Sequence, residues 1–298
     1  MKPLTINNRL FEWGSQTYIM GIINITPDSF SGDGLSRQQS PISAALNQAR
    51  HFVETGADIL DVGGESTRPG AEPVSAEEEQ ARVLPIIEAL AKEFDTPVSI
   101  DTYRASTAAA ALDVGAHLVN DVWALRADHG LAPLAARRGV PIILMHNRSK
   151  PANASIRKNL GGRYISVEYD DLLADIKSEL IESVSLARQA GISEENIIID
   201  PGIGFGKTVE QNLELLDRAN EIRELGYPIL VGPSRKSFIG YTLDLPADQR
   251  IEGTAAAVAI AIARGADIVR VHDVEAMARV AKMTDALVRR VAPKAPSP

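Results

Sequence analysis

The segment "ETGADILDVGGES" (residues 54–66) contains the pattern on which the fold of this chain depends. A helical pattern ends at Gly-Ala, a short apolar run follows, and polar residues close the segment. Glycine at this point suits a left-handed helix C-cap. Apolar runs without polar alternation are typical of parallel strands that are buried on both faces. The segment therefore predicts a helix, a tight turn and one strand of a parallel sheet.

The same pattern recurs along the chain. Its other copies are "DVGAHLVNDV" (113–122), "RRGVPIILMHN" (137–147), "QAGISEENIIIDPG" (189–202), "ELGYPILVGPS" (224–234) and "RGADIVRVHDV" (264–274). Two further strands, "YIMGIINIT" (18–26) and "PVSIDT" (97–102), lack the glycine. Eight strands that alternate with helical segments predict a (β/α)8 TIM barrel. A doubly wound open sheet, which shows the same alternation, is the alternative.

The remaining segments complete this predicted architecture. Long amphipathic helices are expected over residues 75–94, 166–191 and 208–225, the first opening on Ser75 with Glu78 three positions later, a capping-box layout. Before Tyr18, "GSQ" (14–16) between two short extended runs predicts a β-hairpin that caps the barrel bottom. We expect a single barrel domain over residues 1–291 and a disordered tail over 292–298.

Composition excludes several functional classes. The 298 residues carry a net charge of −8, which argues against a nucleic-acid partner. The most apolar run, residues 255–263, is far shorter than the roughly 18 to 20 residues that span a bilayer. There is no cysteine, so disulfides and thiolate metal sites are excluded, and a reducing compartment suits the chain. We expect a cytoplasmic protein without a membrane or nucleic-acid partner.

The glycine-rich run "IDPGIGFGKT" (199–208) resembles a phosphate-binding P-loop at its Gly-Lys-Thr end. That motif needs four residues between its first glycine and the Gly-Lys-Ser/Thr. The required first position is occupied by Pro201, and counting from Gly202 leaves only three intervening residues. The run is therefore not a nucleotide-triphosphate loop.

Polar side chains end every predicted strand, at the edge where TIM barrels carry their active sites. They are Asn24, Asp61 with Glu65, Asp101, Asn120 with Asp121, His146 with Asn147, Asp200, Ser234 with Arg235 and Lys236, and Arg270 with His272. A single strand-end aspartate often only caps the next turn, and for Asp61 and Asp121 both roles stay open. Eight polar ends that converge on one mouth favour a functional site.

The mouth divides by charge into two parts. Arg68, Arg235, Lys236, Arg270 and His272 suit an anion, and Asn24 offers an amide oxygen to Mg²⁺, which completes its shell with water and substrate phosphate. Asp101, Asn120 and Asp200 offer acceptors for a planar heterocycle that bears amino groups. The predicted ligand is therefore a polar heterocycle that carries a phosphate group.

These motifs together resemble the dihydropteroate synthase family. The matching segments, in the family's order and over nearly the whole chain, are "MGIINITPDSFS" (20–31), "DVGGESTRPGAEPVS" (61–75), "VSIDT" (98–102), "VNDV" (119–122), "DPGIGFGK" (200–207), "SRKSFIG" (234–240) and "RVHDV" (270–274). The resemblance implies a TIM barrel that condenses dihydropterin-methyl diphosphate with 4-aminobenzoate, releasing diphosphate. "GDGL" (32–35), "MHN" (145–147) and Trp123 depart from the family pattern, so Asp33 and Asn147 are not assigned roles.

The resemblance also implies a role for each site residue. Asp101, Asp200, Lys236 and Arg68 are the expected catalytic residues. The pterin is expected to contact Asp101, Asn120, Met145, Asp200 and Lys236; the diphosphate Asn24, Arg68, Arg270 and His272, with Mg²⁺ on Asn24; and the aminobenzoate Thr67, Pro69, Phe205 and Ser237. Because an arylamine is already a neutral nucleophile near pH 7, catalysis should rest on positioning and on electrostatic stabilisation.

The sequence leaves two alternative functions open and also predicts an oligomeric state. A pterin-binding methyltransferase shares the Asp and Asn contacts but needs no cation cluster for diphosphate, and a non-catalytic pterin-binding or regulatory paralogue would bind pterin without turnover. The segment "TAAAVAIAIARG" (254–265) predicts a helix that is small and apolar nearly all round. Such a helix is usually buried on more than one side. Together with the family resemblance, this predicts a homodimer.

Overall fold

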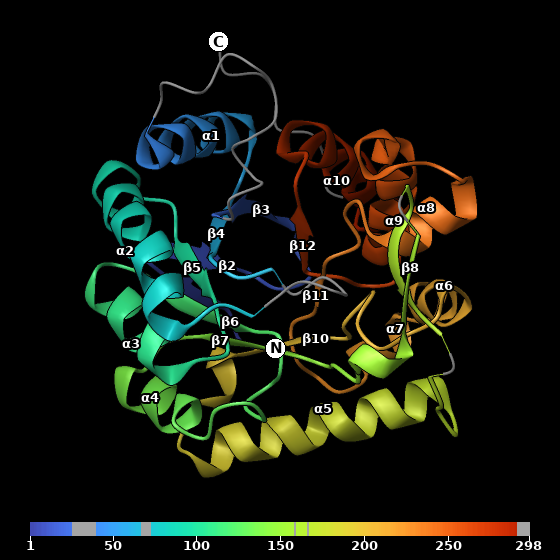
Figure 1. Cartoon of the computed structure of the whole chain (residues 1–298), viewed down its shortest axis with the longest axis horizontal. Helices are drawn as coiled ribbons and strands as arrows, with labels where there is room; N and C mark the ends of the chain where they lie inside the picture. The colour runs from blue at the N-terminus through green and yellow to red at the C-terminus, as the bar shows by residue number, and fades with distance from the viewer. Residues whose placement is uncertain (26–39, 67–72, 158, 166, 291–298) are drawn as a thin grey trace.

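Eight parallel strands form the centre of the molecule, and helices surround them (Figure 1). The computed structural model describes residues 1–25, 40–66, 73–157, 159–165 and 167–290. The barrel strands are β3 (Tyr18–Asn24), β4 (Ile59–Gly63), β5 (Val98–Asp101), β6 (Leu118–Asp121), β7 (Ile142–Met145), β10 (Ile197–Asp200), β11 (Leu230–Val231) and β12 (Ile268–Val271).

The sheet closes on itself. Its strand order is β10-β7-β6-β5-β4-β3-β12-β11, and a parallel bridge between Ile199 and Ile229 joins the two ends. Across the same seam, Ile199 N donates to Pro228 O at 2.9 Å. Closure confirms the predicted (β/α)8 barrel and rules out the open doubly wound sheet.

The helices lie on the outside of the barrel and cover the apolar outer faces of the strands (Figure 1). They are α1 (Pro41–Thr55), α2 (Ala76–Glu93), α3 (Ala105–Asp113), α4 (Leu131–Arg138), α5 (Leu172–Gln189), α6 (Val209–Asp217), α7 (Asn220–Arg223), α8 (Ser237–Leu243), α9 (Ile251–Ala263) and α10 (Val274–Val288), with 3-10 turns η1 (Pro151–Asn153), η2 (Glu194–Asn196) and η3 (Ala247–Gln249). None of the helices in the described ranges combines the length and apolar character needed to cross a membrane.

Two predicted helix boundaries were wrong. The helix expected from residue 166 begins at Leu172, because the Asp171 side chain caps it by accepting from Ala174 N at 2.9 Å. The helix expected over residues 208–225 is broken into α6 and α7. Asp217 and Asn220, which are weak helix formers, flank the break. For α2, the predicted cap is confirmed, since Ser75 Oγ accepts from Glu78 N at 3.1 Å.

The N-terminal hairpin is present, but its turn lies elsewhere than predicted. Strands β1 (Leu4–Ile6) and β2 (Arg9–Phe11) pair through a turn at Asn7 and Asn8, not at residues 14–16. Both asparagines adopt left-handed φ, of 46° and 61°, which a tight two-residue hairpin requires and asparagine tolerates. Leu4, Ile6 and Phe11 pack with Met20, Ile59 and other residues that start the barrel strands. The hairpin therefore seals the barrel at its N-terminal end, as expected.

A second hairpin was not predicted. Strands β8 (Ala154–Arg157) and β9 (Gly161–Tyr164) pair antiparallel between β7 and α5. Their sequence shows no regular apolar alternation, and the hairpin is held instead by tertiary contacts. Arg250 Nη2 donates to Leu160 O at 3.0 Å, and Tyr241 Oη donates to Gly161 O at 3.2 Å.

The glycine run between β10 and α6 packs its backbone against neighbouring backbone. Gly202 has a φ of +72°, and a Cβ at this position would lie 1.8 Å from His146 O. Gly206 (φ +59°) has the same relation to Arg148, whose carbonyl carbon would lie 2.3 Å from a Cβ. The glycines therefore serve close approach of two loops, which explains the run without a nucleotide.

Replacement of Gly202 tests this packing. Gly202→Ala should lower the free energy of unfolding by at least about 3 kcal/mol, because it adds a backbone clash to a left-handed φ. Gly139→Ala is the matched control, since Gly139 also has a left-handed φ (+64°) but nothing lies within 4 Å of its Cβ position. It should cost about 1 kcal/mol. Equal losses in urea unfolding would show that close approach does not matter.

Candidate active site

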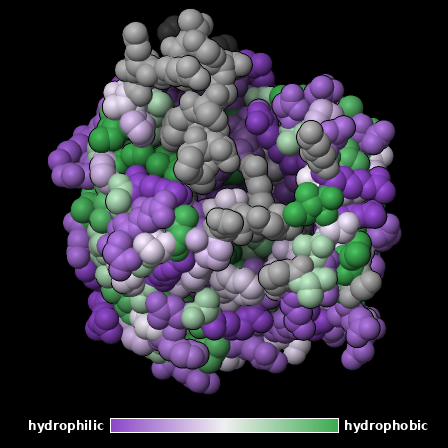
Figure 2. All heavy atoms as spheres, viewed as in Figure 1, coloured by the Kyte–Doolittle hydropathy of each residue, from purple (hydrophilic) through white to green (hydrophobic). Residues whose placement is uncertain are grey.

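Strand register brings the predicted pterin-binding residues to one edge of the barrel. Asp101 is the register partner of Asn120 on the neighbouring strand, and Asp200 is the partner of Met145. Asn120, Met145 and Asp200 are buried, whereas the Asp101 side chain keeps 16% of its surface exposed. Hydrophilic residues predominate on the face shown in Figure 2, with hydrophobic residues in scattered patches. The four side chains that sequence and resemblance assigned to the pterin therefore lie at one edge of the barrel.

Arg270 connects three strands across this mouth. Its Nε donates to Asp61 Oδ2 at 2.6 Å and its Nη2 donates to Asp101 Oδ2 at 2.7 Å. Asn120 Nδ2 also donates to Asp61 Oδ2, at 3.3 Å. Burial raises the pKa of Asp101 to about 7, although the charge of Arg270 opposes this shift. Asp61 is thus an ion-pair partner and not a turn cap.

Asp200, Lys236 and Phe205 form a second cluster beside the first. Gly202 N donates to Asp200 Oδ1 at 2.7 Å and so orients the carboxylate. Lys236 donates to Ile203 O, and its Nζ lies 4.5 Å from the centroid of the Phe205 ring. Burial lowers the pKa of Lys236 to about 8, against the opposing charge of Asp200. The two residues expected at the pterin and the one expected at the aminobenzoate are therefore adjacent.

Arg235 takes a different role from its neighbour. Its φ is +56°, and its Nε donates to Asp273 Oδ2 at 2.9 Å. Beside this pair, Ser234 Oγ lies 3.0 Å from His272 Nδ1 and accepts from His272 N at 3.1 Å. The pair with Asp273 fits the bracing role that was the alternative to anion binding for Arg235. Arg235 braces the loop that presents Lys236.

Three other polar strand ends have structural roles. Asp121 caps a turn, accepting from Trp123 N at 2.8 Å and from Leu125 N at 2.6 Å. Asn147 Nδ2 donates to Val122 O at 3.0 Å. Glu65 accepts from Arg104 Nη1 at 2.6 Å. For Asp121 the turn-capping alternative was therefore correct.

Of the remaining predicted site residues, the structure describes some and not others. Asn24 ends β3 and pairs in register with Gly63, and Ser237 is the first residue of α8; both are partly buried. Thr67, Arg68 and Pro69 lie outside the described residues. Within the described ranges no group of three or more His, Cys, Asp or Glu side chains could hold a metal ion.

A buried polar network behind the site was missed by sequence reasoning. Lys207 is 1% exposed, and its Nζ lies 2.9 Å from His146 Nδ1. On the other side of the imidazole, Nε2 lies 3.2 Å from Glu179 Oε2 of α5, away from the ideal hydrogen-bond direction. Arg148 Nε donates to Glu179 Oε1 at 2.6 Å. The lysine was visible in the glycine run, but nothing in the sequence pointed to a partner 61 residues away.

Comparison with known proteins gives a consistent result. The model of the family described as "Pterin binding enzyme" matches residues 20–272. The dihydropteroate synthase of Clostridium beijerinckii is 50% identical over 288 residues, covering 96% of this chain and 100% of that protein. The dihydropteroate synthase of Bacillus subtilis is 48% identical over 279 residues, covering 94% of this chain and 91% of that protein.

Solved structures agree. A Clostridium difficile dihydropteroate synthase, crystallised in the presence of pteroic acid, matches with a TM-score of 0.83 and 45% identity over 94% of this chain and 99% of that one. A Xanthomonas albilineans dihydropteroate synthase with 4-aminobenzoic acid matches with a TM-score of 0.86 and 38% identity over 98% of this chain and 99% of that one.

The His146 contacts predict how stability depends on pH. Burial, followed by the charge of Lys207, lowers the pKa of His146 from 6.5 to about 3. Between these values the unfolded chain binds a proton that the native protein does not, so stability falls as pH falls. Contacts with His146 and Arg148 outweigh burial and lower the pKa of Glu179 from 4.5 to about 2. Glu179 therefore also makes stability fall as pH falls, but only below pH 4.5.

We therefore expect His146→Gln to remove part of the acid sensitivity. From pH 6.5 to 4.5 the variant should lose on the order of 2 kcal/mol less stability than the unmodified protein. Urea unfolding midpoints across this range measure the difference, in which the carboxylates common to both proteins cancel. Parallel pH profiles would mean that His146 is not held neutral.

Proposed function

This chain belongs to the pterin-binding enzyme family and is a dihydropteroate synthase, and from that premise we propose how its barrel mouth divides the reaction. The enzyme condenses (7,8-dihydropterin-6-yl)methyl diphosphate with 4-aminobenzoate. A C–O bond to the diphosphate breaks at the methylene carbon, a C–N bond forms there, and the arylamine loses a proton. The observation that carries the assignment of roles is the adjacency of the Asp101–Arg270 and Asp200–Lys236 clusters.

The pterin end of the site is the part that the structure describes most fully. Asp101, Asn120 and Asp200 accept from the amino-pyrimidine edge, for which paired carboxylate oxygens are strong acceptors. Since Gly202 N binds one oxygen of Asp200, the carboxylate is oriented before the substrate arrives. Lys236 donates to the ring carbonyl and N5, and Met145 packs on the ring. As the diphosphate departs, Asp101 and Asp200 stabilise the positive charge that develops on the pterin.

Arg270 joins the pterin end to the diphosphate end. Two of its nitrogens are bound to Asp61 and Asp101, so the guanidinium is fixed in position before catalysis. With His272 and Arg68 it takes up the negative charge of the leaving diphosphate. Phe205 and Ser237, with Thr67 and Pro69, border the aminobenzoate. No strong general base is required, because the arylamine is neutral at physiological pH.

Magnesium fits this arrangement as a partner of the diphosphate. Asn24 supplies one amide oxygen, and the described residues do not add a cluster of acidic or histidine ligands. That donor set suits Mg²⁺, which commonly takes few protein ligands and completes its shell with water and phosphate oxygens. When bound, the ion would neutralise charge on the diphosphate. A cytoplasmic location, suited to a chain without cysteine, is part of the same proposal.

Diphosphate release tests the function and the role of Lys236. The unmodified protein should release diphosphate only with both substrates, and faster with magnesium. A pterin methyltransferase or a non-catalytic paralogue would release none.

Lys236→Ala should lower kcat/KM. The corresponding loss of transition-state stabilisation should be on the order of 2 to 4 kcal/mol, because a charged donor is lost from a desolvated site. Lys177→Ala, on the outer helix α5, is the control. Unchanged kinetics in Lys236→Ala would mean that the wrong member of the Arg235–Lys236 pair was assigned to the pterin.

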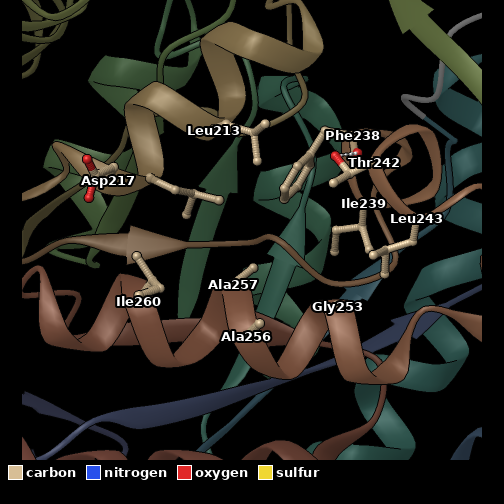
Figure 3. A pocket seen from close by; sticks show the side chains of 11 residues that line it. Leu213, Asp217, Phe238, Ile239, Thr242, Leu243, Gly253, Ala256, Ala257 and Ile260 are labelled. Atoms are coloured by element: carbon tan, nitrogen blue, oxygen red, sulfur yellow. Dashed lines mark hydrogen bonds between the residues drawn. The ribbon is translucent and has the colours of Figure 1, made fainter.

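A homodimer completes the proposal. An apolar groove lies between α6, α8 and α9, and Figure 3 shows Leu213, Phe238, Leu243 and Ile260 around it. Leu213, Leu243 and Ile260 are 44%, 46% and 45% exposed, which is unusual for large apolar side chains so close together. Helix α8 runs from Ser237 at the site to this groove. We assign the groove to a second copy of the chain.

Light scattering at micromolar protein concentration tests the dimer. The unmodified chain should have the mass of two copies, and Ile260→Glu should have the mass of one, because a buried unpaired carboxylate is costly. Leu186→Glu is the matched control, since Leu186 is also 45% exposed but lies on α5, away from the groove. A single-copy mass for the unmodified chain would refute the dimer, and dimeric Ile260→Glu would place the interface elsewhere.

A further inference from the structure

Lys207 is fully buried, although it is not among the residues that contact either substrate in the proposed site. Its Nζ donates to Gly202 O and to Phe205 O, each at 3.0 Å, and lies 2.9 Å from His146 Nδ1. Three acceptors match the three N–H groups of an ammonium. Burial lowers the pKa of Lys207 well below its usual value, and a neutral amine would keep both carbonyl contacts while accepting from Nδ1–H. The contacts to the turn are thus independent of protonation.

The two carbonyls belong to the turn that connects the two halves of the site. At its start, Gly202 N binds Asp200; within it, Phe205 N donates to Gly202 O at 3.1 Å. The Phe205 ring faces Lys236, which donates to Ile203 O of the same turn. One amino group therefore holds the beginning of the turn, which follows Asp200, and its end at Phe205.

The third contact anchors the turn to the rest of the barrel. His146 N donates to Asp200 O at 2.9 Å, so His146 is part of the β7–β10 seam. Its imidazole lies between Lys207 and Glu179 of α5. Tyr169 Oη donates to Gly206 O at 2.9 Å on the adjoining side. A buried lysine is costly and is retained only where its contacts compensate.

We propose that Lys207 is a positioning residue for the second substrate, which holds the 202–207 turn so that Phe205 stays beside Lys236. The proposal rests on the assignment of Phe205 to the aminobenzoate. Asp200 has independent support from strand β10 and from His146 N. Phe205 lies within the turn, and its ring contacts Lys236. Loss of the amino group should therefore affect the aminobenzoate more than the pterin.

The test compares Lys207→Met with Lys177→Met in the full-length protein. Methionine fills the space of the lysine stem but donates no hydrogen bond. For Lys207→Met the KM for 4-aminobenzoate should rise at least about tenfold, while the Kd of the pterin diphosphate, from calorimetric titration, should change less than about threefold. Lys177→Met, which loses a partly exposed pair with Glu224, should match the unmodified protein. Equal loss for both substrates, or none, overturns the proposal.

A double-variant comparison separates positioning from general destabilisation. If Lys207 acts through Phe205, adding Lys207→Met to Phe205→Ala should raise the aminobenzoate KM little further. Independent, multiplying effects overturn the proposal. Should Lys207→Met fail to fold, His146→Gln is measured instead, since it keeps both carbonyl contacts of Lys207. It should raise the aminobenzoate KM about threefold without weakening pterin binding. An unchanged KM counts against the proposal. Failure of the proposed function is distinct, because the unmodified protein would then release no diphosphate.

Discussion

The guanidinium of Arg270, shared between Asp61 and Asp101, is the interaction on which the mouth of this barrel depends. The two carboxylates come from neighbouring strands and would repel each other in a buried setting. Arg270 reaches them from β12 with hydrogen bonds of 2.6 and 2.7 Å. Removing only the arginine, or only the carboxylates, would leave a buried charge without a partner. The stability lost in that way is far larger than the net contribution of the ion pair. Strand order thus places the cation within hydrogen-bond distance of both acids.

This arrangement also suits the chemistry. A reaction in which positive charge develops on the pterin while a diphosphate departs from its methylene carbon requires fixed charges of both signs, close together and shielded from water. The barrel supplies acids from β5 and β10 and cations from β12 and the loop after β11. Because each charge is held by a strand end or by a braced loop, such as Arg235 with Asp273, little reorganisation is needed during the reaction.

The glycine turn after β10 shows how backbone packing supports the same site. Its left-handed glycines allow contact with the backbone of residues 146–149, and this contact encloses the Lys207 amino group. The buried polar network that results is fixed from several sides, by α5, by β7 and by the turn itself. Local propensity would not select such a conformation. Deviations from local rules of this kind are expected where function determines the structure.

The sequence by itself determined the barrel and most of the residues at its mouth. Repeated glycine turns followed by apolar runs carry the alternation of helix and strand, and parallel strands must end at a common edge. Asp101, Asn120, Asp200 and Lys236 could therefore be predicted as neighbours. The two asparagines of the N-terminal turn, in contrast, were overlooked in favour of a nearby glycine, and the β8–β9 hairpin shows no apolar alternation.

Only the tertiary structure decided how the charges pair. Sequence left Arg235 open between bracing its loop and binding an anion, and the structure pairs it with Asp273. Nor did sequence indicate that Arg270 pairs with two carboxylates. It left Asp61 and Asp121 equivalent, although one is an ion-pair partner and the other a turn cap. It gave no indication that Lys207 and His146 meet. Such pairings depend on distances between segments far apart in the chain, which strand closure and loop packing set and which local residue patterns do not encode.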